Sequence, residues 1–134
     1  MRSRTRFQAP NVVVVDDDGL LLQLMTRSLE RVNVRCTTAS SYAEAMELVG
    51  SFRVGVFDIE LGDGSGVDVA GALVEAGRVS HCIFFTGGAS REQLERAGVL
   101  GEIFSKGAGV SEVVRRVGEL IAMDNGPGVR RREG

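Results

Sequence analysis

The sequence lacks any long apolar run. None of its hydrophobic segments approaches the roughly 18 residues that a membrane-spanning helix needs. The arginine-rich first residues are not followed by the apolar stretch of a secretory signal peptide. We therefore predict a cytoplasmic protein that makes no contact with a membrane.

Cysteine, histidine and lysine are also scarce. The two cysteines, Cys36 and Cys82, fall in predicted strands and are interpreted as buried, reduced thiols. The one histidine, His81, begins a predicted strand without a partner motif, so we interpret it as an ordinary strand-edge residue. Lys106 is the single lysine beside fifteen arginines. This contrast makes Lys106 a candidate site residue.

The chain has no excess of positive charge that would indicate a nucleic-acid partner. Its net charge is −2, and arginines cluster at both ends, where we interpret them as solvated tails. Residues 11–123 contain 10 basic and 16 acidic side chains, a net charge of −6. Such an acidic body suits a bound cation better than a polyanion.

The length of 134 residues, of which 43% are hydrophobic, fits one domain with a single core. We place this domain at residues 11–123, between a flexible N-terminal tail (1–10) and a flexible C-terminal tail or linker remnant (124–134). The second boundary rests on the helix-breaking cluster that begins at Asn125.

Short β-branched runs alternate with amphipathic segments along this domain. The predicted strands are 12–15, 34–38, 52–57, 81–85 and 102–105. The predicted helices are about 20–32, 41–49, 67–76, 90–97 and 111–123. The alternation predicts an α/β fold: a doubly wound, flavodoxin-like, five-stranded parallel sheet in the order 2-1-3-4-5, with helices on both faces.

Four of the predicted strands end in polar residues. These are Asp16 and Asp17 after the first strand, Asp58 after the third, Thr86 at the end of the fourth and Lys106 after the fifth. Ligands of such sheets bind beyond the carboxyl ends of the strands, so we expect these side chains to form one site. Neighbouring carboxylates repel one another unless a cation joins them, and carboxylates beside phosphate oxygens favour Mg²⁺. A compact ammonium contacts one oxygen where a planar guanidinium would not fit.

The four strand ends carry recognisable motifs: Val-Val-Asp16-Asp17-Asp18, Phe57-Asp58, Phe85-Thr86-Gly87 and Ser105-Lys106. In this order they resemble the signature of response-regulator receiver domains of two-component signalling, over about residues 11–123. The resemblance implies a phosphorelay switch and not a conventional enzyme. A phosphohistidine on a histidine kinase or histidine phosphotransfer protein would give its phosphoryl group to Asp58, and the changed conformation would control a partner.

The resemblance also implies a role for each site residue. The implied ligands of Mg²⁺, for which Mn²⁺ could substitute, are Asp16 (directly or through water), Asp17, Asp58 and the backbone carbonyl of Glu60. The implied phosphoryl contacts are Thr86, Gly87 and Lys106. Positioning and charge neutralisation would supply most of the catalysis.

Several positions depart from the family pattern. Gly107 follows Lys106 where the family usually has proline, and Gly62 stands where proline is frequent. In the switch region, Ile103 replaces the usual aromatic residue, and Phe104 beside it is expected to face the opposite side of its strand. The spacing between the fourth and fifth strand ends is short, which predicts a curtailed fourth helix. We expect an intact phosphorylation site and an altered relay to the output surface.

Two other functions are compatible with parts of this pattern. One is a phosphatase with an aspartyl nucleophile, although such enzymes carry Asp-x-Asp after the first strand. The other is a receiver-like interaction module that is never phosphorylated. The presence of all the site residues argues against this alternative. We expect a monomer or weak dimer, no direct contact with nucleic acid, and output through either a separate protein or a further domain.

Overall fold

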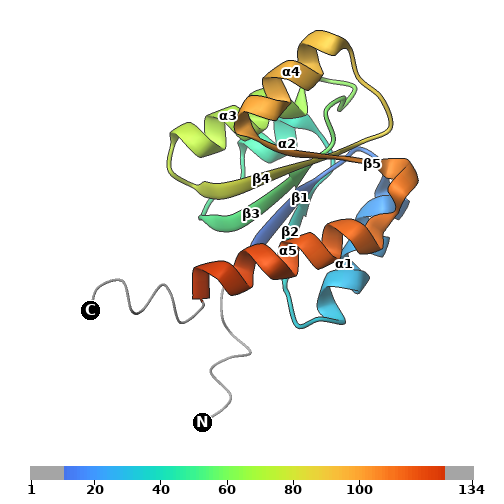
Figure 1. The fold of residues 1–134 in the computed structure, drawn as a ribbon. Helices are drawn as coiled ribbons and strands as arrows, with labels where there is room; N and C mark the ends of the chain where they lie inside the picture. Colours follow the sequence, from blue (N-terminus) through green and yellow to red (C-terminus); the bar gives the residue numbers. More distant parts are fainter. Residues whose placement is uncertain (1–10, 126–134) are drawn as a thin grey trace.

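The computed structural model describes residues 11–125, which form a five-stranded parallel sheet in the order β2-β1-β3-β4-β5 (Figure 1). The strands are β1 (Val12–Val15), β2 (Cys36–Ala39), β3 (Phe52–Phe57), β4 (Val79–Thr86) and β5 (Gly101–Ser105). The helices are α1 (Gly19–Glu30), α2 (Tyr42–Met46), α3 (Gly66–Glu75), α4 (Arg91–Leu100) and α5 (Val110–Asn125), with a short 3-10 helix at Lys106–Ala108. The predicted fold class and strand order are confirmed.

Two apolar layers, one on each face of the sheet, form the core. Figure 1 shows α1 and α5 against one face and α2, α3 and α4 against the other. Because side chains alternate along a strand, the four valines of β1 divide between the layers. Val13 and Val15 join the layer beneath α2, α3 and α4, and Val12 and Val14 join the layer beneath α1 and α5. Burying each valine stabilises the fold by about 1.5–3 kcal/mol relative to exposure.

Side-chain caps begin four of the helices. The N-caps are Asp18 for α1, Ser41 for α2, Ser65 for α3 and Ser90 for α4. Ser41 and Glu44 have the spacing of a capping box at the start of α2, but the box is only half formed. Ser41 accepts from the backbone N–H of Glu44, but the Glu44 carboxylate accepts from the N–H and hydroxyl of Ser40 instead of reaching Ser41.

Four helix ends differ from the predicted ones by two or more residues, and α1 ends at Glu30, two residues earlier than predicted. Helix α2 ends at Met46 because the Arg78 guanidinium donates to the carbonyls of Leu48 and Gly50, which stabilises a non-helical path there. Helix α4 is not curtailed at residue 97 but reaches Leu100, and β5 begins at the next residue. The short spacing between the fourth and fifth strand ends therefore reflects the lack of a loop between α4 and β5, and α4 itself is not shortened. Helix α5 ends two residues later than predicted, so residues 124–125 of the predicted C-terminal tail are helical, and residues 1–10 and 126–134 lie outside the described residues.

Close packing explains the direct passage from α4 to β5. A Cβ atom at Gly101 would lie 2.1 Å from the Cys82 carbonyl oxygen, so only glycine fits where the chain turns into the sheet. Cys82 is buried as predicted, and burial raises the pKa of its thiol to about 12. Cys36, which lies on the edge strand β2, is only half-buried, contrary to the prediction, and its Sγ lies 3.5 Å from Thr26 Oγ1.

His81 has a partner that its sequence neighbourhood did not indicate. Its Nε2 lies 3.3 Å from Oδ1 of Asp124, and Arg53 Nη1 lies 3.7 Å from the other oxygen of the same carboxylate. The interpretation of His81 as an ordinary strand-edge residue did not include this contact, because Asp124 lies 43 residues away in the sequence. The two side chains fasten the last turn of α5 to the amino-terminal ends of β3 and β4.

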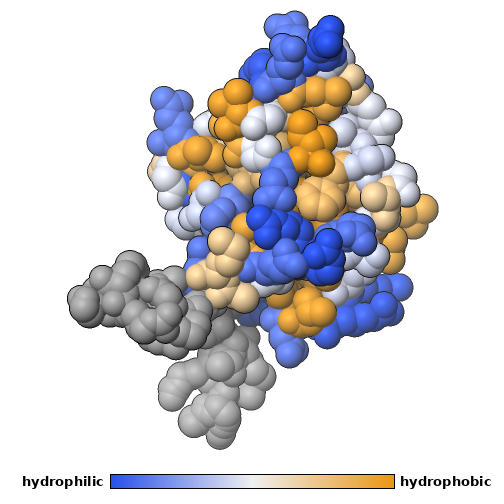
Figure 2. Space-filling model, in the orientation of Figure 1, coloured by the Kyte–Doolittle hydropathy of each residue, from blue (hydrophilic) through white to orange (hydrophobic). Residues whose placement is uncertain are grey.

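Charged side chains cover the outer surface of α5, and Figure 2 shows hydrophilic residues gathered there. Arg116 donates to both carboxylate oxygens of Glu102 on β5 and to Glu119, while Arg115 pairs with Glu112 and Glu119. Exposed pairs of this kind contribute little to stability because solvent screens them. Within residues 11–125, no helix combines the length and apolar character needed to cross a bilayer.

Candidate functional site at the carboxyl ends of the strands

The parallel register brings the polar strand ends to one edge of the sheet. Val15 of β1 pairs with Phe57 of β3, so the residues that follow them, Asp16 and Asp58, leave the sheet side by side. The backbone N–H of Asp58 donates to the Val15 carbonyl (2.8 Å), which extends the ladder by one residue. Strand pairing therefore brings the ends of β1 and β3 side by side, as expected.

Three carboxylates gather at this edge. Asp16, Asp17 and Asp58 each place one oxygen within 4.8 Å of the others. Asp16 and Asp58 are buried, with 2% and 8% of their surface exposed, whereas Asp17 faces solvent. Burial of two carboxylates side by side is unfavourable without a compensating cation.

Lys106 supplies one such cation. Its Nζ donates to Asp58 Oδ2 (3.2 Å) and lies 2.9 Å from Asp16 Oδ2. Its aliphatic stem passes Gly87, where an added Cβ atom would lie 3.9 Å from Lys106 Cδ. One ammonium faces three carboxylates, so negative charge remains uncompensated in the cluster.

The pKa shifts reflect this imbalance. The pKa of Asp58 lies above its usual value because burial and then the charge of Asp16 disfavour ionisation, and Lys106 offsets them only in part. Burial lowers the pKa of Lys106, but its contacts with Asp16 and Asp58 outweigh this effect, so the net pKa is raised and the ammonium stays charged. The oxygen-only donor set and its excess negative charge fit a hard divalent cation.

Thr86 and Gly87 lie at the adjoining strand end. Thr86 is buried; its hydroxyl donates to the Gly88 carbonyl (3.1 Å) and lies 3.3 Å from the Gly88 N–H, from which it accepts. The hydroxyl thus closes the turn after β4 in this state. The predicted contact residues are at the site edge, with Gly87 beside the Lys106 stem.

The loop after Asp58 is a small hairpin. The N–H of Leu61 donates to the Gly64 carbonyl, and the N–H of Gly66 donates to the Ile59 carbonyl. These bonds flank the antiparallel bridge between Glu60 and Ser65. Residues between two such bonds point their own N–H and C=O groups away from the partner strand. The Glu60 carbonyl, a predicted metal ligand, is therefore directed out of the hairpin.

Glycines allow the hairpin to fold back on the acceptor residue. A Cβ atom at Gly66 would lie 1.8 Å from the Asp58 carbonyl oxygen, so no other residue fits this close approach. Gly62 has a φ of +84° at the hairpin tip. These positions explain why the segment after Asp58 is rich in glycine: it forms a tight turn.

The two residues of the predicted switch region face opposite sides of β5. Ile103 is 41% exposed, whereas Phe104 is half-buried against the layer beneath α1 and α5. The peptide bond between Lys106 and Gly107, where the family usually has proline, is trans.

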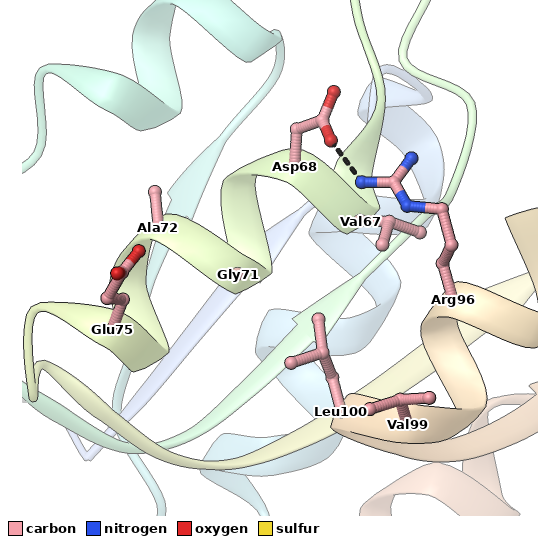
Figure 3. A pocket seen from close by; sticks show the side chains of 8 residues that line it. All are labelled: Val67, Asp68, Gly71, Ala72, Glu75, Arg96, Val99 and Leu100. Carbon is pink, nitrogen blue, oxygen red and sulfur yellow. Dashed lines mark hydrogen bonds and ion pairs between the residues drawn. The ribbon is translucent and has the colours of Figure 1, made fainter.

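A separate open groove of about 520 Å³ lies between α3 and α4 (Figure 3). Asp68 and Arg96 form an ion pair across it, and Val67, Val99 and Leu100 contribute apolar lining. The groove contains none of the strand-end residues described above. The chemistry that the sequence predicts therefore belongs to the acidic cluster.

Residues 12–117 match the response regulator receiver domain. The chain belongs to this family. Receiver domains are signalling domains of two-component phosphorelays, so the predicted class of function is confirmed. No curated protein matches the chain.

Solved receiver domains have the same fold. The non-phosphorylated HemR receiver domain from Leptospira biflexa is 28% identical with a TM-score of 0.74, and the match covers 85% of this chain and 95% of that one. The receiver domain of Francisella response regulator 1452 is 23% identical with a TM-score of 0.72, covering 84% and 96%. A Burkholderia pseudomallei response regulator is 24% identical with a TM-score of 0.69, covering 88% and 76%; its structure contains a phosphorylated aspartic acid, a calcium ion and citrate.

One residue near the receiver site was missed in the sequence. The Asp63 carboxylate accepts from the backbone N–H groups of Tyr42 (2.8 Å) and Ala43 (3.1 Å). These bonds lower the pKa of Asp63. No local pattern links positions about twenty residues apart, and Asp63 looked like an ordinary turn residue between two glycines.

Proposed function

We propose that this receiver domain accepts a phosphoryl group on Asp58 and changes conformation in response. The observation that carries the proposal is the placement of Asp58: a buried carboxylate at the end of β3, held by Lys106 and within 4.8 Å of the Asp16 and Asp17 carboxylates. A buried carboxylate with a raised pKa and a cation partner is the type of group that functional sites contain.

In the proposed reaction, a carboxylate oxygen of Asp58 attacks the phosphorus of a phosphohistidine on a histidine kinase or histidine phosphotransfer protein. The O–P bond forms as the P–N bond breaks, and the imidazole nitrogen leaves with the electron pair of that bond. Such transfer depends on positioning and on neutralising the charge of the phosphoryl oxygens. Lys106, which already donates to Asp58, would hold one of these oxygens.

The residues around Asp58 fit a magnesium site. Asp16, Asp17, Asp58 and the outward-directed carbonyl of Glu60 would hold Mg²⁺, or Mn²⁺ in its place. When bound, the ion neutralises charge shared by the carboxylates and the phosphoryl oxygens. The Burkholderia neighbour, with its phosphorylated aspartic acid and calcium ion, supports the pairing of these two features in this fold.

The structure also suggests how phosphorylation changes the domain. Lys106 holds Asp16 and Asp58 together, and the Thr86 hydroxyl is bound within its own turn. A phosphoryl group adds about −1.5 to −2 charge and three acceptor oxygens at Asp58. We expect Lys106, the Thr86 hydroxyl and the Gly87 N–H to turn toward those oxygens, which would shift the β4–α4 loop and alter the surface offered to a partner.

Phosphorylation with a small donor tests this proposal. Acetyl phosphate and Mg²⁺ should add the mass of one phosphoryl group to the intact protein, and Asp58→Asn, which lacks the nucleophile, should remain unmodified. Omission of Mg²⁺ should suppress the modification. An unmodified wild-type protein would contradict the proposal, and sustained turnover of p-nitrophenyl phosphate would indicate a phosphatase instead.

A further inference from the structure

The Asp63 carboxylate binds the loop that follows the proposed phosphoacceptor to the start of helix α2. Both oxygens of the Asp63 carboxylate are used: Oδ1 accepts from the Tyr42 N–H and Oδ2 from the Ala43 N–H. These are the first two N–H groups of α2, which have no partner within the helix. Ser41 accepts from the N–H of Glu44, so the two capping residues satisfy different donors.

A second contact joins the same two segments. A Cβ atom at Gly64 would lie 2.6 Å from Cδ2 of Tyr42, so the hairpin backbone lies directly against the Tyr42 ring. Substitution of Gly64 would push the hairpin away from α2. Asp63 and Gly64 thus bind adjacent parts of one helix start, one through charge-assisted hydrogen bonds and the other through packing.

The other side of the hairpin tip approaches the acidic cluster. A Cβ atom at Gly62 would lie 3.5 Å from Oδ2 of Asp17. The tip therefore stands between α2 and the Asp17 carboxylate. The hairpin itself has only two backbone hydrogen bonds across its strands, from Leu61 to Gly64 and from Gly66 to Ile59. Its position over the cluster thus depends on outside contacts.

From this arrangement we infer that Asp63 is a positioning residue for the metal site. By capping α2, Asp63 holds the hairpin of residues 59–66 over the acidic cluster and keeps the Glu60 carbonyl directed outward. The inference rests on the proposed function, since it concerns the same Mg²⁺ site. It adds helix α2, which contributes no ligand, to the parts of the fold that set the affinity for the ion.

The test compares Asp63→Ala and Asp63→Asn with the wild type. Asp68→Ala serves as the matched control, because Asp68 is also an exposed aspartate whose carboxylate holds another element, through Arg96 of α4, without touching the hairpin. Hydrogen exchange of the Tyr42 and Ala43 amides reports on the cap. Mg²⁺ affinity is measured by titration of the amide resonances of residues 58–62.

We expect Asp63→Ala to speed exchange at the Tyr42 and Ala43 amides and to weaken Mg²⁺ binding about tenfold, the lower end of the effect of removing a residue that orients a metal ligand. Asp63→Asn keeps one acceptor and should lie between Asp63→Ala and the wild type in both measurements. Asp68→Ala should bind Mg²⁺ like the wild type. The intermediate Asn variant separates positioning from loss of folding, because it retains part of the cap.

The outcomes distinguish this inference from the proposed function. Equal Mg²⁺ affinity of the wild type and Asp63→Ala would overturn the inference and leave phosphorylation of Asp58 untouched. Equal weakening by Asp63→Ala and Asp68→Ala would also overturn it, because it would indicate a general loss of stability. A wild-type protein that neither binds Mg²⁺ nor accepts a phosphoryl group would remove the proposed function and the inference together.

Discussion

At the scale of single residues, the choice of lysine at position 106 has a geometric reason. The Lys106 ammonium reaches Asp16 and Asp58 at once, and its stem lies against Gly87. A compact point charge such as the Lys106 ammonium fits between the three carboxylates and a phosphoryl group on Asp58. A guanidinium is wider and holds two oxygens in one plane.

We predict that Lys106→Arg keeps the charge but fails as a substitute. The guanidinium should hold the unphosphorylated carboxylates bidentately, so Asp58 should be phosphorylated more slowly and without the change in the loop after β4. Acetyl phosphate kinetics and amide shifts on adding beryllofluoride measure the two effects. As Lys106 is the only lysine, its labelled ammonium gives one NMR signal, which should shift in the wild type. A variant that switches normally would contradict the prediction.

Asp58 also allows a prediction about pH and stability. Its raised pKa means that the ionised carboxylate lowers the stability of the native state at neutral pH. As pH falls through this raised pKa toward the ordinary value of 3.8, the native state takes up a proton before the unfolded chain does, and the deficit disappears. Asp58→Asn should therefore be more stable than the wild type at pH 7.

Urea unfolding at a series of pH values tests this expectation. The difference in unfolding free energy between Asp58→Asn and the wild type should shrink as the solution becomes acidic. Titrating groups that do not interact with Asp58 cancel in the difference, and Lys106, whose pKa is raised, stays charged throughout this pH range. A difference that stays constant between neutral pH and pH 4 would show that ionisation of Asp58 carries no penalty in the fold.

At the scale of elements, the hairpin after β3 depends on one close approach. Gly66→Ala would place a Cβ atom 1.8 Å from the Asp58 carbonyl oxygen, so the hairpin and the start of α3 must move. We predict a loss of about 2–4 kcal/mol in unfolding free energy, together with weaker phosphorylation of Asp58. Circular dichroism melting and intact mass after acetyl phosphate measure the two losses.

Gly98→Ala is the matched control for Gly66→Ala. Gly98 lies in α4, is exposed, and an added Cβ atom would meet nothing within 4 Å. Alanine there should stabilise the protein by about 0.5–1 kcal/mol because it reduces the conformational entropy of the unfolded chain. Equal effects of the two substitutions would mean that the hairpin yields without strain.

The loop between β4 and α4 is the element that we expect to transmit the signal. Ile103 has no hydroxyl group, so a change of its rotamer cannot be transmitted through a hydrogen bond. Its side chain is already 41% exposed. Gly87 and Gly88 make the preceding loop pliable. Beryllofluoride should therefore shift the amides of residues 87–89 more than those of Ile103 and Phe104. Changes concentrated at Ile103 and Phe104, with a quiet loop, would show that the usual relay persists.

At the scale of the whole molecule, we expect the acidic cluster to couple ion binding to folding. The three carboxylates come together only in the folded sheet, so an ion that binds there stabilises the native state by mass action. At a Mg²⁺ concentration one hundred times the dissociation constant, the gain is about 2.7 kcal/mol. The melting temperature should rise with Mg²⁺, and the rise should be smaller in Asp58→Asn. A melting curve that millimolar Mg²⁺ leaves unmoved would contradict the cation site.

Much of this architecture follows from local patterns. Consecutive valines in β1 require burial on both faces, and the alternation of strands and helices permits few arrangements. The strand-end motifs carry the candidate site because the carboxyl ends of parallel strands always share one edge. For these reasons, the fold class, the strand order and the family were predictable without coordinates.

The sequence by itself determined which residue types end each strand, and therefore that one edge of the sheet is acidic. Only the tertiary structure decided which groups touch across long separations. The capping of α2 by Asp63, the pairing of His81 with Asp124 and the full length of α4 all arise from contacts between distant segments. The physical reason is that periodicity and capping are local properties of the backbone. The partner of an exposed charge, or the end of a helix, is instead set by whichever distant backbone and side-chain groups the fold brings within hydrogen-bonding distance.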